Sequence, residues 1–253
     1  MVYDLQKAGI WKRIAAWMFD GILTGMLAVG FALVLSGLLG YDSYSQSVDM
    51  AYNKYEQEYG IEFNISQDEY AEMSEAERQS YDAAYQAMTA DKSLLYNYNM
   101  MLNLMLIITS AGILLAILLW EFAIPLWIGN GQTLGKKIFG LCLVRTDGVK
   151  LNNIQLFTRT ILGKFTVDTM LPVYILFLTF WGTMGLMGTV ILFALAVAQL
   201  LSVALSRTNA ALHDLLAGTA VVDIYSQMIF RSTEDLIAFK KQVAADQAAR
   251  QPY

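Results

Sequence analysis

The sequence places one carboxylate, Asp20, inside an apolar run that continues to about Leu39. An aspartate at the centre of a bilayer costs about 2.5–3.5 kcal/mol on insertion scales, so its presence there calls for a partner or a function. Arg13 precedes Asp20 by seven residues, which is nearly two helical turns, so the two side chains share one stripe of the predicted helix. We expect Asp20 to face protein or enclosed water, because hydrocarbon cannot solvate it.

Few basic residues could pair with Asp20 at membrane depth, and the best candidates are Arg159 and Lys164 in a later apolar segment. Lys164 precedes Asp168 by four residues, a spacing that favours a local ion pair in an α-helix. Glu121 adds a further carboxylate near the end of the second apolar stretch. Two interpretations stay open because both need the same residues: a proton- or cation-binding site, and a buried ion-pair network that orders the bundle.

His213 is the only histidine, and Asp214 follows it directly. A His–Asp pair suggests acid–base chemistry, but adjacent residues on a helix point apart, so an interfacial anchor and a proton relay both remain hypotheses. A single histidine cannot build a His-based metal site, and the lone Cys142 excludes an intrachain disulfide and a Cys-based metal cluster. No Ser or Cys arrangement completes a hydrolytic set. The sequence therefore predicts a protein that is not an enzyme and that binds no metal or other cofactor.

The composition is that of a polytopic membrane protein. Hydrophobic residues make up 56% of the chain and charged residues 15%, which is too little charge for an ordinary soluble surface. Four stretches are long and apolar enough to cross a bilayer, at about 14–39, 100–128, 156–180 and 183–206. We expect the third to be the least regular, because it carries three charged residues and Pro172 can redirect it. The predicted fold class is all-α, a four-helix transmembrane bundle.

The distribution of basic residues predicts the orientation of these spans. Only Lys54, Arg78 and Lys92 of the 17 basic residues lie within 40–98, which holds 12 of the 22 acidic ones. Basic loops stay in the cytoplasm. We therefore expect a multi-pass protein of the cell (plasma) membrane with both termini and the loop 129–155 in the cytoplasm.

The chain divides into four parts by pattern: 1–39 with the first span, an acidic and Tyr-rich extracytoplasmic insert at 40–98, the remaining membrane core at 99–230, and a tail at 231–253. In the insert, Ser66 and Glu69 form a capping box that favours helix to about Met88. The insert is interpreted either as a solvated helical cap or as a vestibule that collects cations or ligands. In the tail, the residues from Ser232 to about 248 predict a capped amphipathic helix.

The basic inner loop predicts a small cytoplasmic β-hairpin. Residues 138–145 have the pattern of a short strand, an Asp-Gly turn follows, and 149–151 could return as the second strand. The glycines before it do not form a phosphate-binding loop, because Asn130 stands where the first glycine is needed and Lys137 replaces the required Ser or Thr.

Three segments together resemble the RDD family, membrane proteins named for one arginine and two aspartates. Arg13 and Asp20 match the first two signature positions, and Asp214 is placed as the third. The family's central motif is resembled by the segment with Gly131, Thr133, Gly135, Lys136 and Gly140. The family's closing motif is resembled by the segment from His213 to Thr219. The resemblance implies an integral membrane protein of unassigned molecular function, for which a transport role has been proposed.

The leading functional hypothesis is passage or exchange of a small ion or solute through a buried site at Asp20. The accompanying site residues would be Arg13, Asp214, Arg159 and Lys164. The expected partners are the lipid bilayer, a small cation or a proton, and further copies of the chain, because four spans are few for a transporter; nucleic acid is not expected. The alternative is a non-transporting membrane scaffold or accessory protein in which the buried charges are structural.

Overall fold

The computed structural model describes residues 5, 8–182, 185–206 and 209–250. The chain forms two compact units. The core unit comprises residues 1–29 and 113–253, and the insert unit comprises residues 30–112. The helices α1 (Ile10–Leu39) and α5 (Lys92–Ile117) contribute residues to both units.

The insert unit is built from α-helices. Between α1 and α5 it contains α2 (Tyr41–Tyr59), α3 (Gln67–Glu72) and α4 (Glu75–Ala90), and α2 packs against α4. The predicted capping box at Ser66 and Glu69 is present. The predicted helix to Met88 is nevertheless divided, because Met73 is extended and Ser74 begins α4 with a second capping box.

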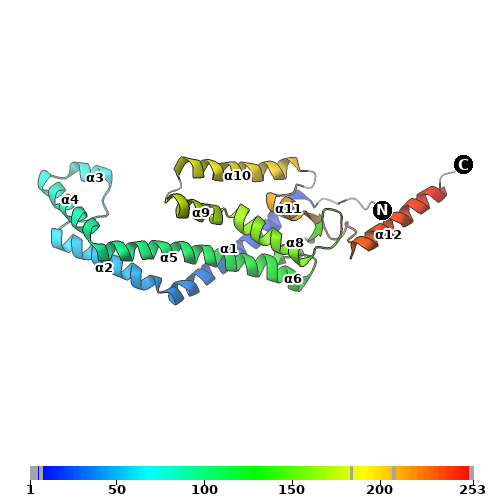
Figure 1. Ribbon diagram of the computed structural model, residues 1–253, viewed down its shortest axis with the longest axis horizontal. Coiled ribbons are helices and arrows are strands. Elements are labelled where there is room, and N and C mark those ends of the chain that lie inside the picture. The colour runs from blue at the N-terminus through cyan, green and yellow to red at the C-terminus, as the bar shows by residue number, and fades with distance from the viewer. Residues whose placement is uncertain (1–4, 6–7, 183–184, 207–208, 251–253) are drawn as a thin grey trace. The chain divides into compact units, whose positions relative to one another are not determined.

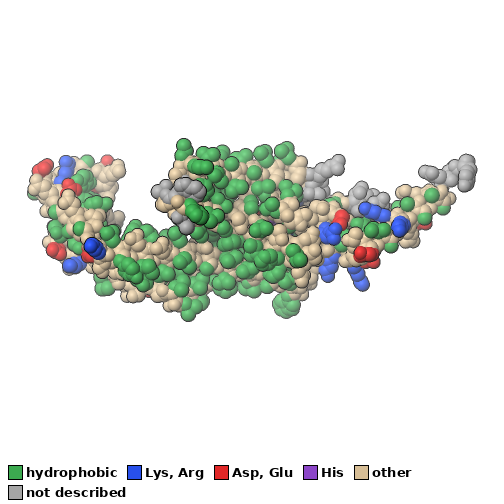
Figure 2. All heavy atoms as spheres, viewed as in Figure 1, with side chains coloured by type: hydrophobic (Ala, Val, Ile, Leu, Met, Phe, Trp, Pro, Cys, Tyr) green, Lys and Arg blue, Asp and Glu red, His purple; other side chains and the backbone are tan. Residues whose placement is uncertain are grey.

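The core unit follows α5 with a larger set of short elements. In chain order these are η1 (Leu118–Ala123), α6 (Ile124–Ile128), α7 (Leu134–Ile138), β1 (Leu141–Arg145), α8 (Asn153–Thr158), η2 (Arg159–Asp168), α9 (Leu171–Trp181), α10 (Gly185–Leu205), α11 (Leu212–Ala217), β2 (Thr219–Asp223) and α12 (Thr233–Arg250). Figure 1 shows α10 running alongside α9, and the two helices are in contact. Hydrophobic side chains cover the visible face of α9 and α10, whereas charged side chains gather around α12 (Figure 2).

Three helical segments have the length and apolar character of membrane spans: 10–39, 92–128 and 185–205. A fourth pair, Asn153–Asp168 with Leu171–Leu178, meets the same test only as a broken span with a bend of 59°. The bend lies at Met170, which has a left-handed backbone conformation with φ 57°, just before Pro172. The irregularity that the sequence predicted for the third span is thus present. A proline near a helix start is well tolerated, so α9 can begin directly after the bend.

Two of the spans contain π-helix, and these segments lie against each other. Thr160 of η2 donates a hydrogen bond to the backbone oxygen of Glu121 in η1, at 3.2 Å. In a π-helix the backbone bonds run from i to i+5, which widens each turn and turns side chains away from their α-helical positions. Gln199 of α10 donates to the backbone oxygen of Val167 at 2.7 Å and so ties α10 to η2.

The predicted small sheet exists, but the predicted hairpin is wrong. β1 pairs antiparallel with β2, which lies far along the chain. The segment after the Asp-Gly turn makes only isolated bridges, an antiparallel one between Val144 and Lys150 and a parallel one between Val149 and Phe230. Both faces of the sheet are buried: Leu143 and Val221 pack in one hydrophobic cluster and Cys142 packs in another. The apolar β2 strand can fill both clusters, whereas the short 149–151 segment, which includes Lys150, cannot.

The predicted tail helix is confirmed as α12, with its first turn capped by Ser232. Leu236 is the buried residue of this helix and packs with Val149 and Phe230. The tail is therefore attached to the strand end of the core unit by apolar contact.

The pairing of the strands gives a direct test, because Cys142 lies opposite Val222 in the register. Paired antiparallel strands place Cα atoms about 4.5–5.5 Å apart, which suits a disulfide. We expect Val222→Cys to form a disulfide with Cys142 under catalysed oxidation, measured by mass spectrometry. Oxidation needs a catalyst because burial, together with the charge of Asp223, raises the pKa of Cys142 to about 12.

The neighbouring Val221→Cys serves as the control, because its side chain points to the opposite face of the sheet. Equal cross-linking in both variants would contradict the observed register.

Candidate functional site

Asp20 is buried, and its carboxylate accepts three hydrogen bonds and forms one ion pair. Trp120 Nε1 and the Gly135 backbone nitrogen donate to Oδ1 at 3.0 and 2.9 Å. Thr133 Oγ1 donates to Oδ2 at 2.5 Å, and Lys136 Nζ lies 3.6 Å from the same oxygen. The prediction that Asp20 faces protein with several donors nearby is confirmed.

The partners of Asp20 come from the loop that carries the central sequence motif. Thr133 caps α7 with its side chain, which leaves the backbone N–H of Gly135 in the first turn free to bind a carboxylate. Gly135 also has to lack a side chain, because a Cβ atom would lie 2.7 Å from the Ala16 carbonyl oxygen and 2.8 Å from Asp20. Gln132 anchors the loop to the backbone oxygen of Leu141 in β1 at 2.6 Å.

The predicted partners of Asp20, Arg159 and Lys164, bind elsewhere. Arg159 Nη1 lies 3.7 Å from Glu121 Oε2, and Lys164 Nζ pairs with Glu121 Oε1. These two residues are five apart in η2, and the π-helical turn brings both toward η1. Lys136 reaches the same carboxylate at 3.4 Å. The predicted Lys164–Asp168 pair is absent for the same reason, because four residues no longer make one turn.

Asp214 is the second buried carboxylate of this region. Arg159 Nε donates to Oδ1 at 2.8 Å, and Arg13 Nη2 lies 3.7 Å from Oδ2. Burial on its own raises the pKa of Asp214, but the charges of Arg159, His213 and Arg13 outweigh it and hold that pKa below its ordinary value. The signature residues Arg13 and Asp214 thus meet, whereas Asp20 binds the loop.

His213 and Asp214 were expected to point apart, and in part they do. His213 Nδ1 lies 2.7 Å from Asp168 Oδ2, while its Nε2 lies 3.7 Å from Asp214 Oδ1. The imidazole therefore stands between two carboxylates. Gly163 allows His213 to approach η2 this closely, because a Cβ atom at Gly163 would lie 2.4 Å from the Cβ of His213. The sequence singled out His213 but gave no signal that Asp168 would be its partner.

The ion pairs form one connected network of four cations and four anions, and His213 joins Asp168 to the rest of it. Its cations are Arg13, Lys136, Arg159 and Lys164, and its anions are Asp20, Glu121, Asp168 and Asp214. Removing one member of a buried pair strands the opposite charge, which costs about 3–5 kcal/mol. Burial lowers the pKa of Lys136, and the charge of Glu121 offsets part of that effect.

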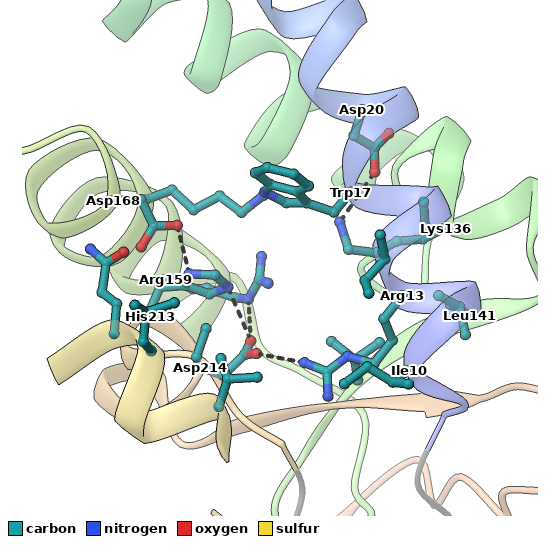
Figure 3. Close-up of a pocket in the computed structure, with 18 residues that line it drawn as sticks. Ile10, Arg13, Trp17, Asp20, Lys136, Leu141, Arg159, Asp168, His213 and Asp214 are labelled. Carbon is teal, nitrogen blue, oxygen red and sulfur yellow. Dashed lines mark hydrogen bonds and ion pairs between the residues drawn. The ribbon is translucent and has the colours of Figure 1, made fainter. Parts of the chain in front are cut away.

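A cavity of about 360 Å³ opens beside the network. Its apolar wall includes Ile14, Trp17 and Val203, and the charged wall includes Asp168 and His213 (Figure 3). Cavities of this size hold small ligands, with few polar groups that set orientation. No cluster of three or more His, Cys, Asp or Glu side chains suited to a metal ion occurs among the residues that the structure describes.

The close approach at Gly135 predicts a strong effect of one methyl group. Gly135→Ala should push α7 away from α1, weaken the Asp20 contacts and lower the free energy of unfolding by about 1–3 kcal/mol. Gly21→Ala is the control, because nothing lies within 4 Å of a Cβ atom there. Thermal unfolding in detergent measures both. A Gly135→Ala protein as stable as Gly21→Ala would contradict the packing described for this loop.

The depressed pKa of Asp214 predicts how acid affects stability. A carboxylate whose folded-state pKa lies below its ordinary value of 3.8 adds stability above that pH and loses it as the pH falls toward the folded-state value. We expect the melting temperature of the wild type to drop between about pH 5 and pH 3, and Asp214→Asn to melt lower near neutral pH with a shallower decline. Parallel curves for the two proteins would show that Asp214 carries no such linkage.

The model of the RDD family matches residues 7–218. No curated protein and no solved structure matches the chain.

Proposed function

Because the chain belongs to the RDD family of membrane proteins, we propose that it exchanges a small cation for a proton across a membrane. The apolar helices and the family indicate a multi-pass membrane protein. In the proposed topology there are four spans, the broken pair 153–178 being one of them. Both termini and the strands face the cytoplasm of a plasma membrane, because most of the basic residues lie at that end. The insert unit then lies outside.

The observation that carries the proposal is the contact of His213 with Asp168 on the wall of the cavity of about 360 Å³. The Asp168 side chain is 30% exposed, whereas the other carboxylates of the network are 4% exposed or less. Carboxylate oxygens bind hard cations, and histidine changes its charge near neutral pH. A cation at Asp168 and a proton on His213 satisfy the same negative charge, so each disfavours the other. Competition of this kind is the minimum that exchange requires.

The remainder of the network has a supporting role in this proposal. With His213 neutral, its four cations and four anions cancel, so the change at His213 and Asp168 occurs in surroundings of fixed charge. Asp20 lines the cavity too, but its two oxygens already accept from four groups. We assign Asp20 the task of holding the loop 131–136 against α1 rather than the task of carrying the proton.

A second function also has an observation in its favour. The balance of buried charges suits a membrane scaffold, in which every charge is structural and no ion passes. The two functions differ at His213, since a scaffold has no use for a group that gains and loses a proton at a cavity. Neither proposal includes a cofactor, a resident metal ion or an enzymatic activity.

Purified protein in liposomes separates the two functions. We expect wild type to couple a sodium or potassium gradient to proton movement, and His213→Gln to lose this flux by roughly tenfold or more because glutamine does not titrate. Its melting temperature should stay close to that of wild type. Asp20→Asn should instead lower the free energy of unfolding by about 3–5 kcal/mol, because it leaves Lys136 with one partner fewer.

The control is Asp147→Asn, the same chemical change at a half-exposed surface pair with Arg145. It should alter neither flux nor melting. Absence of flux in wild type under every gradient tested would reject exchange and favour the scaffold.

A further inference from the structure

A second cavity, of about 230 Å³, lies farther along α1 in the core unit. Its wall includes the small residues Gly21, Gly25 and Ala28 of α1, together with Thr24. Glu121 of η1 and Thr169 beyond η2 also contribute. Small residues on one helix face leave room beside the neighbouring helix, and here that room is bordered by charged and hydroxyl groups rather than by apolar ones alone.

We propose that the two cavities are the two halves of one ion path and that Trp17 closes it between them. The inference rests on the proposed function, since it names the route for the exchanged cation. Three residues line both cavities, namely Trp17, Lys164 and Asp168, and they therefore form the layer where the cavities meet.

The two cavities follow one another along α1. The larger cavity, which we call the strand-side cavity, begins at Ile10 on α1, and the second, the far cavity, ends at Ala28. The eighteen helical steps between these two residues rise about 27 Å. The apolar span of α1 continues to Leu39, so the two cavities together extend from the strand end of this span past its middle. Neither cavity alone does so.

The charged residues of the shared layer are held from opposite sides. Lys164 pairs with Glu121, whereas Asp168 pairs with His213. Trp17 differs from them, because its side chain is largely exposed, at 67%, and is not packed into the core. Figure 3 shows its indole beside the cavity, between α1 and the Asp168 side. A large ring that is not packed can change rotamer without disrupting the fold, as a barrier must.

The position of Asp168 connects the barrier to the exchange. Since Asp168 lines both cavities, a cation bound to it borders both of them and can pass from one to the other once the ring moves. The far cavity has space for about seven water molecules at about 30 Å³ each, and its wall offers them polar partners. A small cation can therefore arrive at Asp168 with part of its hydration shell.

Cysteine accessibility tests the path without measuring transport. The background is Cys142→Ala, in the full chain, in sealed vesicles of both orientations. Thr24→Cys reports the far cavity and Ala211→Cys the strand-side cavity. The probe is a small, membrane-impermeant, positively charged methanethiosulfonate, which reacts with thiolates that water can reach. We expect Ala211→Cys to react only from the strand side and Thr24→Cys only from the opposite side.

Adding Trp17→Ala should open the barrier. Thr24→Cys should then react from the strand side as well, at a rate roughly tenfold or more above the closed protein. The matched control is Met18→Ala, the neighbouring exposed residue that lines neither cavity, and it should leave the pattern unchanged. Ile22→Cys, exposed on α1 and absent from both cavity walls, should stay unreactive in the bilayer. Thermal melting checks that each variant is folded.

Three results would overturn the inference. In the first, Thr24→Cys reacts from the same side as Ala211→Cys although Trp17 is present. In the second, Thr24→Cys reacts from neither side. In the third, Trp17→Ala leaves the accessibility of Thr24→Cys unchanged. Because the readout is access and not flux, the two proposals fail separately. Absent flux with the expected access pattern would reject exchange alone, whereas coupled flux with the wrong pattern would reject this route alone.

Discussion

The burial of charge inside apolar helices is the constraint on which the rest of this structure depends. A carboxylate such as Asp20 cannot remain in hydrocarbon without donors, and the apolar face of α1 supplies none. The donors come from a polar loop, in which Gly135 and Lys136 contact the Asp20 carboxylate on α1. The same demand recurs at Glu121 and Asp214, and Arg159 meets both. Each requirement draws in an element that is distant in sequence, so the network determines which elements lie together.

The two π-helical segments are best understood from the same constraint. Glu121 lies in η1, and the cations that neutralise it lie in η2. An α-helical turn would send Lys164 toward Asp168, and the wider turn sends it to Glu121 instead. Asp168 is thereby left to His213, at the wall of a cavity. The irregular backbone separates the buried charges around Glu121 and Asp214 from the His213–Asp168 pair at the cavity wall.

Much of this architecture follows from sequence, because hydrophobic length, capping residues and the cost of a buried charge are local properties. They sufficed for three of the four expected spans, for the capping box at Ser66 and for the burial of Asp20, while the remaining span is a pair of helices with a bend of 59°. The pairings did not follow, because they depend on distant segments meeting. The sequence around Cys142 contains no signal that Val222 will pair with it. The α-helical spacing predicted the wrong partner for Lys164, because this residue lies in a π-helix with a longer period. The family resemblance identified Arg13, Asp20 and Asp214 but not their partners.

The central claim is that a cation and the proton of His213 compete for Asp168. His213 is the only histidine of the chain, so nitrogen NMR of tag-free, histidine-labelled protein reports this one ring. At constant pH, addition of sodium or potassium chloride should release the proton from His213 in a saturable manner, and Asp168→Asn should abolish that response. Choline chloride at the same ionic strength should have no effect. A ring whose protonation ignores the cation, or responds equally in Asp168→Asn, would contradict the account.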